Sequence, residues 1–177
     1  MSKKKAPAAH FPTFEVEALD GTAYTVPADF RSPLNLVLLW FQEQRPERVD
    51  HWVLLVDRID DGAEYDLSVY EMPVIGKGFG MLGGLFNAGM RVQARNAEIE
   101  ARTLPLYVDK SDLAKQLGIK KTKELQAFLV APDGRIAWHG EGDIDLDEVA
   151  GIEALVGATL SDRPAGAGPP QKGDGPA

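Results

Sequence analysis

A run of apolar residues from Leu34 to Phe41, followed closely by the start of a helix, constrains the fold of this chain more than any other stretch. The run reads Leu-Asn-Leu-Val-Leu-Leu-Trp-Phe, and such a continuous series of branched and aromatic residues is typical of a strand buried on both faces. Pro46 suits the first turn of the following helix, where the N–H that proline lacks would have no partner. The stretch predicts an α/β protein whose central strand leads into a helix N-terminus, a junction that can hold an anion or a reactive group.

Patterns on either side of this run predict the elements of the first half of the chain. Alternating residues around Asp20-Gly21 predict an N-terminal β-hairpin from Phe14 to Val26. Apolar residues at spacings of three and four predict a helix from about Pro46 to Asp60. A second buried strand is expected from Tyr65 to Met72, with Pro73 taking the chain out of the sheet.

The second half of the chain continues the alternation of helices and strands. A polar helix is expected over Arg91 to Arg102 and a short strand over Leu104 to Asp109. Ser111 is a suitable N-cap for a helix over Asp112 to Leu117, which Gly118 would end. The remaining expected elements are a hairpin of Leu125 to Val130 and Arg135 to Trp138 around the turn Ala131-Pro132-Asp133-Gly134, and a helix from Asp145 to Val156 with Leu146, Val149, Ile152 and Leu155 facing inward.

This order of elements predicts one domain over residues 11–160, between a flexible arm at 1–10 and a disordered tail at 161–177 that is rich in glycine and proline. The predicted fold is an α/β three-layer sandwich of the thioredoxin-like type. It has a mixed central sheet, helices on both faces and an N-terminal β-hairpin. The three tryptophans lie in apolar patterns and are expected in the core.

Charge and cysteine content exclude several classes of function. The chain contains no cysteine, which excludes disulfides, thiolate nucleophiles and cysteine-ligated metals within it. The net charge of −8 argues against a nucleic-acid partner. No apolar run reaches the roughly 20 residues of a membrane-spanning helix, and no apolar segment follows the N-terminal lysines as in a secretory signal. We expect a cytoplasmic protein that can lie peripherally at a membrane, with no cofactor and no metal.

The N-terminal third resembles the entry to thioredoxin-like domains of the peroxiredoxin class. The resemblance rests on Phe11-Pro12-Thr13-Phe14, on Asp20-Gly21, on Pro27-Ala28-Asp29-Phe30 and on the strand Val37 to Phe41. It implies that Arg45 and Arg48 stand where that class has a Cys-Pro-x-Cys pair, and that Leu125 stands at the position of a cis-proline. Both parts of the redox device would then be replaced in this chain.

One cysteine-free branch of this fold resembles the chain more closely, namely bacterial relatives of the mitochondrial ATP-synthase assembly-factor chaperones. The shared residues are the Phe-Pro-x-Phe opening, Trp52, Met72-Pro73, Leu125 to Val130, the hairpin strand Arg135-Ile136-Ala137-Trp138, and Gly140 with Gly142. This resemblance implies a redox-inactive assembly factor or chaperone that binds a client protein, and its mitochondrial members implicate a membrane-protein subunit as client. The alternative is an atypical peroxiredoxin-like enzyme or a small-anion-binding protein that uses Arg45 and Arg48.

Two interpretations of Arg45 and Arg48 are open from the sequence. Guanidinium groups and free amides at a helix N-terminus could bind a carboxylate, a phosphate or an acidic peptide. Otherwise the two side chains point to water and pair with Glu43, Glu47 or Asp50. Similarly, His139-Gly140-Glu141-Gly142-Asp143 contains metal-compatible side chains, but its glycines give no rigid spacing, which favours a loop at the exit of the hairpin.

The segment from Gly76 to Met90 mixes glycine with large apolar residues and carries one charge, Lys77. Glycine at this density weakens a helix by up to about 1 kcal/mol per position, which an ordinary core segment does not need. The segment is expected either to cover one face of the sheet or to form a hydrophobic docking surface. The candidate docking residues are Phe79, Met81, Leu82, Leu85 and Phe86.

Overall fold

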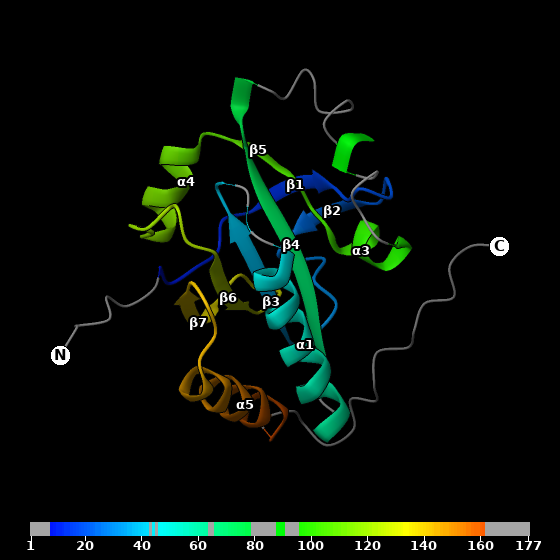
Figure 1. Cartoon of the computed structure of the whole chain (residues 1–177), viewed down its shortest axis with the longest axis vertical. Helices are drawn as coiled ribbons and strands as arrows, with labels where there is room; N and C mark the ends of the chain where they lie inside the picture. The colour runs from blue at the N-terminus through cyan, green and yellow to red at the C-terminus, as the bar shows by residue number, and fades with distance from the viewer. Residues whose placement is uncertain are drawn as a thin grey trace.

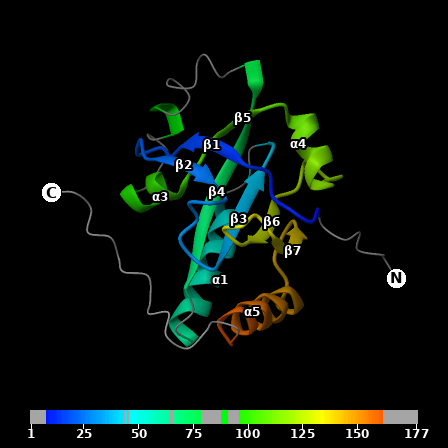
Figure 2. The same cartoon turned by 180° about the vertical axis from the view of Figure 1, so that it is seen from behind.

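The computed structural model describes residues 8–42, 44, 46–63, 66–78, 88–90 and 96–161. Their centre is a five-stranded sheet in the order β5-β4-β3-β6-β7. Strands β3 (Leu34–Trp40), β4 (Leu67–Gly76) and β5 (Leu106–Val108) run parallel, whereas β6 (Gln126–Val130) and β7 (Ile136–Glu141) are antiparallel to their neighbours. Helices α1 (Pro46–Ala63) and α5 (Leu146–Ser161) cover one face, and the hairpin of β1 (Phe14–Glu17) and β2 (Ala23–Val26) covers the other face together with α4 (Lys110–Leu117) (Figures 1 and 2). The thioredoxin-like sandwich predicted from the sequence is confirmed.

The central strand β3 separates two hydrophobic cores. Leu34, Leu36 and Leu38 enter the core under α1 and α5, whereas Val37 and Leu39 enter the core under the hairpin and α4. Each of these five residues is at most 2% exposed, as expected for a strand with both faces covered. The apolar run therefore lies at the middle of the sheet, and its end points at the start of α1.

A buried amide holds β3 to its neighbours. Asn35 is fully buried, and its Nδ2 donates to the carbonyl oxygens of Ser32 at 2.7 Å and Val130 at 3.1 Å. Its Oδ1 accepts the backbone N–H of Ser32 at 3.0 Å. Both the amide nitrogen and the amide oxygen of Asn35 are therefore hydrogen-bonded inside the protein, as a buried polar side chain requires.

Strand β4 is longer than the sequence predicted. It was expected to leave the sheet at Pro73, but it continues to Gly76 because it changes partners there. Trp40 opposite Pro73 is the last pair with β3, and Val74 begins the pairing with β5. Pro73 destabilises the sheet little at this point, because the N–H that it lacks would not belong to the middle of a hydrogen-bonded ladder.

Two of the predicted helix starts are wrong by a few residues. Helix α3 is Ala97–Arg102, and extended backbone at Asn96 separates it from any helix over 91–95, a stretch outside the described residues. The Asn96 side chain accepts the N–H of Ile99 at 3.0 Å. Helix α4 is capped by Asp109, which accepts the N–H groups of Ser111 and Asp112 at 2.9 and 3.0 Å, so Ser111 is not the cap. In both cases a side-chain oxygen accepts N–H groups of the first helical turn, which have no carbonyl partner within the helix.

The last helix, α5, runs five residues past the predicted end. Asp145 and Glu148 form a reciprocal cap, with Glu148 N–H donating to Asp145 Oδ1 at 2.8 Å and Asp145 N–H donating to Glu148 Oε2 at 3.3 Å. Ile152 and Val156 are buried, but Leu146 is 83% exposed and does not face inward. Of the three tryptophans, Trp52 is fully buried, and Trp40 and Trp138 are partly buried at the edge of the core.

Candidate functional site

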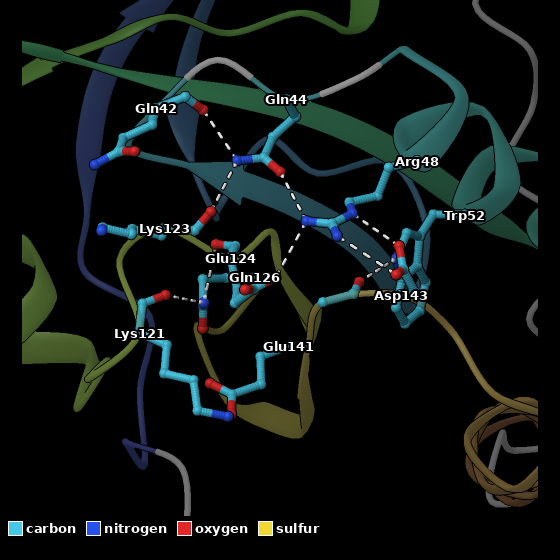
Figure 3. Close-up of polar contacts among 11 residues, drawn as sticks. Gln42, Gln44, Arg48, Trp52, Lys121, Lys123, Glu124, Gln126, Glu141 and Asp143 are labelled. Atoms are coloured by element: carbon cyan, nitrogen blue, oxygen red, sulfur yellow. Dashed lines mark hydrogen bonds and ion pairs between the residues drawn. The ribbon is translucent and has the colours of Figure 1, made fainter.

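The candidate site lies where β3 leads into α1, the place at which the sequence resemblance implied that Arg48 replaces a cysteine, and four segments form it. They are the end of β3, the first turn of α1, the residues just before β6 and the residues just after β7 (Figure 3). Arg48, the third residue of α1, points from the helix toward the other segments and joins them. The side chains that meet at this position are polar, and none of them is a thiol.

Arg48 makes ion pairs with two carboxylates from distant parts of the chain. Its Nε donates to Asp143 Oδ1 at 2.7 Å, and its Nη2 donates to Asp143 Oδ2 at 3.4 Å. Its Nη1 donates to Glu124 Oε2 at 3.1 Å and to Gln44 Oε1 at 3.2 Å. The Arg48 side chain is 18% exposed, against 40% for Glu124 and 69% for Asp143. The guanidinium group is therefore held in a fixed, fork-like geometry with acceptors on each of its nitrogens.

Gln44 extends this network to the loop before β6. Its Nε2 donates to the carbonyl oxygens of Gln42 at 3.1 Å and Lys123 at 3.3 Å, while its Oε1 accepts from Arg48. The segment between β3 and α1 is thus bonded directly to the segment between α4 and β6 (Figure 3). Side-chain hydrogen bonds, and not a disulfide or a metal, thus connect the start of α1 to the segment before β6.

Beneath Arg48, Trp52 closes the site from the core. Its indole Nε1 donates to the carbonyl oxygen of Gly142 at 3.2 Å, and the backbone N–H of Gly142 donates to the carbonyl oxygen of Leu125 at 2.7 Å. Gly142 adopts a φ of 85°, a conformation that favours glycine. Leu125 is fully buried immediately before β6, so the position that the resemblance assigned to a cis-proline is filled by an apolar side chain.

A second group of polar residues lies on the side of Glu124 that faces away from Arg48 (Figure 3). Gln126 donates to the carbonyl oxygens of Lys121 and Glu124 at 3.0 and 3.1 Å, and its Oε1 lies 2.9 Å from His139 Nε2. The side chain of Glu141 hydrogen-bonds to Lys121 at 2.6 Å and raises the pKa of this lysine. His139 also stacks on Phe128, with the ring centroids 4.3 Å apart. The side chain of His139 is used in packing and in hydrogen bonding within the sheet.

The sequence-predicted site residues fall into two groups. Arg45 and the candidate docking residues Phe79, Met81, Leu82, Leu85 and Phe86 lie outside the described residues. Arg48 lies in the first turn of α1, and one of its ion-pair partners, Glu124, directly precedes Leu125. Arg48 does not pair with its helix neighbours Glu47 or Asp50 in the described part of the chain; its carboxylate partners are Glu124 and Asp143.

Glu124 and Gln44 were not identified from the sequence as members of the site. The available signal for Glu124 was its opposite charge to Arg48 and its place next to Leu125. Asp143 was considered only as a metal-compatible residue. Among the residues that the structure describes, no three histidine, aspartate or glutamate side chains come together as a metal site, and no helix is long and apolar enough to cross a membrane.

Comparison with known proteins identifies the fold but no family. No protein-family model and no curated protein matches the chain. Among solved structures, the chain is similar to BsSco, a member of the Sco family of cytochrome c oxidase assembly proteins, with 14% identity, a TM-score of 0.62 and coverage of 92% of this chain and 100% of that one.

Two further structures are similar at the same level. ScoI of Arabidopsis thaliana with copper bound shares 12% identity at a TM-score of 0.55, covering 85% of this chain and 99% of that one. The exposed lipoprotein thioredoxin Etrx1 of Streptococcus pneumoniae shares 16% identity at a TM-score of 0.51, covering 81% and 98%. At these identities the likeness shows a shared fold. The chain has the thioredoxin-like fold, and it has no cysteine at all.

Proposed function

We propose that this protein is a redox-inactive thioredoxin-like protein that acts by binding a client protein, as an assembly factor or chaperone. One observation carries the proposal. In a chain without cysteine, the helix start that would hold a reactive thiolate instead holds Arg48, ion-paired to the segments before β6 and after β7. These bonds stabilise the scaffold, and the absence of cysteine leaves no nucleophile for thiol chemistry.

The resemblance to bacterial relatives of the mitochondrial ATP-synthase assembly factors supports this proposal and extends it to a membrane-protein subunit as client. BsSco is described as a member of a family of assembly proteins, which is a second, independent association of this fold with assembly. The contact surface that we propose for the client is the apolar, glycine-containing segment with Phe79 and Leu85.

The rival proposal is an atypical peroxiredoxin-like enzyme or an anion-binding protein that uses Arg45 and Arg48. It has less support, because the Arg48 guanidinium already pairs with two carboxylates and a glutamine. An anion at this point would also meet Glu124 and Asp143, whose negative charges repel it at a distance of a few ångström.

Site-specific photo-crosslinking in cells of the native host tests the proposal. A photoreactive residue at Phe79 or Leu85 is expected to give one reproducible protein adduct, while the same residue at the exposed turn position Asp133 is expected to give none. Absence of an adduct at both apolar positions would overturn client binding by this segment. Peroxide consumption by the purified protein, lost in Arg48→Ala, would establish the rival instead.

A further inference from the structure

The segment from Lys110 to Lys123 has a charge opposite to that of the whole protein. It contains five lysines and one acidic residue, Asp112, in a chain whose net charge is −8. The five lysines are all exposed, and they lie along α4 and the loop that connects α4 to β6. A concentrated positive patch on an acidic protein attracts negatively charged partners to one place on its surface.

A groove of about 480 Å³ lies within this patch, between the end of β3 and α4. Phe41, Ala114 and Ile119 contribute apolar surface to its lining, and Lys110 and Lys115 contribute ammonium groups. The two elements that form it, the end of β3 and α4, lie near each other in Figures 1 and 2. A groove lined by both apolar side chains and ammonium groups suits a peptide that carries one apolar side chain among acidic ones.

The charges of most of these lysines are not neutralised within the described residues. Lys121 pairs closely with Glu141 at 2.6 Å, but Lys115 reaches Asp112 only at 3.8 Å, with both side chains largely exposed. Lys110 Nζ donates to the carbonyl oxygen of Phe41 at 2.7 Å, which leaves its positive charge uncompensated.

Lys120 and Lys123 directly follow the groove residues Ile119 and Thr122 in the chain. In the part of the protein that the structure describes, neither ammonium group has a carboxylate within 4.0 Å. Exposed charges of this kind contribute little to stability, so they are available for a partner at no cost to the fold.

We propose that this lysine groove binds an acidic peptide segment of a client protein, with one apolar side chain of that segment in the groove. The inference rests on the proposed client-binding function and names the chemistry of the segment that is bound. A short peptide covers this patch alone, whereas a duplex or a membrane would also face the surrounding surface, including Glu141 and Asp143, in a protein of net charge −8.

The test uses the full-length protein and a fluorescein-labelled peptide of glutamates around a central leucine. Fluorescence anisotropy at low salt is expected to show binding that weakens at least tenfold for the double variant Lys120→Glu/Lys123→Glu. The matched double variant Arg58→Glu/Arg135→Glu makes the same change in net charge at exposed positions elsewhere, and its affinity is expected to stay within twofold of wild type. Replacing every glutamate of the peptide by glutamine is expected to abolish binding, and replacing the leucine by serine is expected to weaken it about fivefold.

The proposal would be overturned if the wild type did not bind the acidic peptide. It would also be overturned if both double variants lost the same amount of affinity for this peptide. Tighter binding of single-stranded RNA or of vesicles with 30% phosphatidylserine, lost in Lys120→Glu/Lys123→Glu, would assign the patch to that class of partner. If the client crosslink persists unchanged in Lys120→Glu/Lys123→Glu, the groove proposal fails and the proposal of client binding stands. If no crosslink forms but the acidic peptide binds, the proposal of client binding fails and the groove still binds acidic peptides.

Discussion

Arg48 and Asp143 lie 95 positions apart in the chain and meet through two hydrogen bonds, Nε to Oδ1 at 2.7 Å and Nη2 to Oδ2 at 3.4 Å. With the contact to Glu124, this arginine bonds the first turn of α1 to the two segments that flank the β6–β7 hairpin. Arg48 therefore connects elements of the fold that are distant in sequence.

Removing the Arg48 side chain is expected to destabilise the protein. Arg48→Ala loses ion pairs that are partly screened by water and leaves Glu124 near Asp143, so we expect a loss of about 1–2 kcal/mol in the free energy of unfolding. Arg48→Lys keeps the charge but not the fork, and it should lose about 1 kcal/mol. Urea denaturation followed by circular dichroism measures both. Arg58→Ala, an exposed change on the same helix, should stay within about 0.5 kcal/mol of wild type.

A double-mutant cycle between Arg48→Ala and Asp143→Asn isolates the pair. A coupling free energy of about 0.5–1 kcal/mol is expected for an ion pair whose carboxylate is largely exposed. A coupling free energy of zero would mean that Arg48 stabilises the fold through its other contacts. The ion pair with Glu124 would then be the one that connects α1 to the β6–β7 hairpin.

Trp52 is expected to be more sensitive to substitution than the other two tryptophans. Trp52→Phe removes buried volume and leaves the Gly142 carbonyl without its indole donor, which should cost about 2–3 kcal/mol. Trp138→Phe at a partly buried position should cost about 1 kcal/mol or less. Thermal and urea unfolding compare the two variants directly. Equal losses would contradict the assignment of Trp52 as the residue that closes the site from the core.

Two glycines with open space around them should respond to alanine in opposite directions. Gly118 ends α4 with a φ of 69°, so Gly118→Ala is expected to cost about 1 kcal/mol through backbone strain alone, since an added Cβ would meet nothing within 4 Å. Gly151 lies inside α5 with equally open surroundings, so Gly151→Ala is expected to gain up to about 1 kcal/mol. Unfolding midpoints that shift in the same direction would contradict this reasoning.

Tyr70 is expected to make stability fall at alkaline pH. Burial raises the pKa of Tyr70, against the weaker lowering effect of the hydrogen bond from Arg31 N–H at 3.2 Å. Because the folded state favours the neutral phenol, its contribution is complete below the unfolded pKa of about 10 and is lost as the pH rises through the raised folded-state pKa. Tyr70→Phe should lose about 1 kcal/mol at pH 8, a deficit that narrows above pH 10. A deficit that stays constant with pH would contradict the role of burial.

The sequence predicted the architecture because periodicity and turn chemistry are local properties. The run from Leu34 to Phe41 required both faces of a strand to be buried, and two cores enclose it. The length of β4 was missed, since whether Pro73 ends a strand depends on which neighbour β4 pairs with at that point. The cap of α4 was missed for a related reason: Asp109 and Ser111 are both good caps, and the geometry of the chain leaving β5 decides between them.

The site was predicted only in part. The resemblance assigned Arg48 and Leu125 to one site, but the two carboxylate partners of Arg48 lie 76 and 95 positions away in the chain. Such pairings follow from strand register and loop path, which single-sequence patterns do not specify. The lysine groove was also missed, because its charge is spread over a helix and a loop whose lysines look unremarkable one at a time.

Asn35 has a consequence for the way the sheet can assemble. Its amide reaches Val130 only in the alignment in which the two residues lie opposite each other. A slip of β6 by two residues would keep every apolar side chain on its correct face, but it would move the Val130 carbonyl away from the Asn35 amide. The bonds of Asn35 to Ser32 are local and would survive, so this one amide senses the position of β6 through a single hydrogen bond.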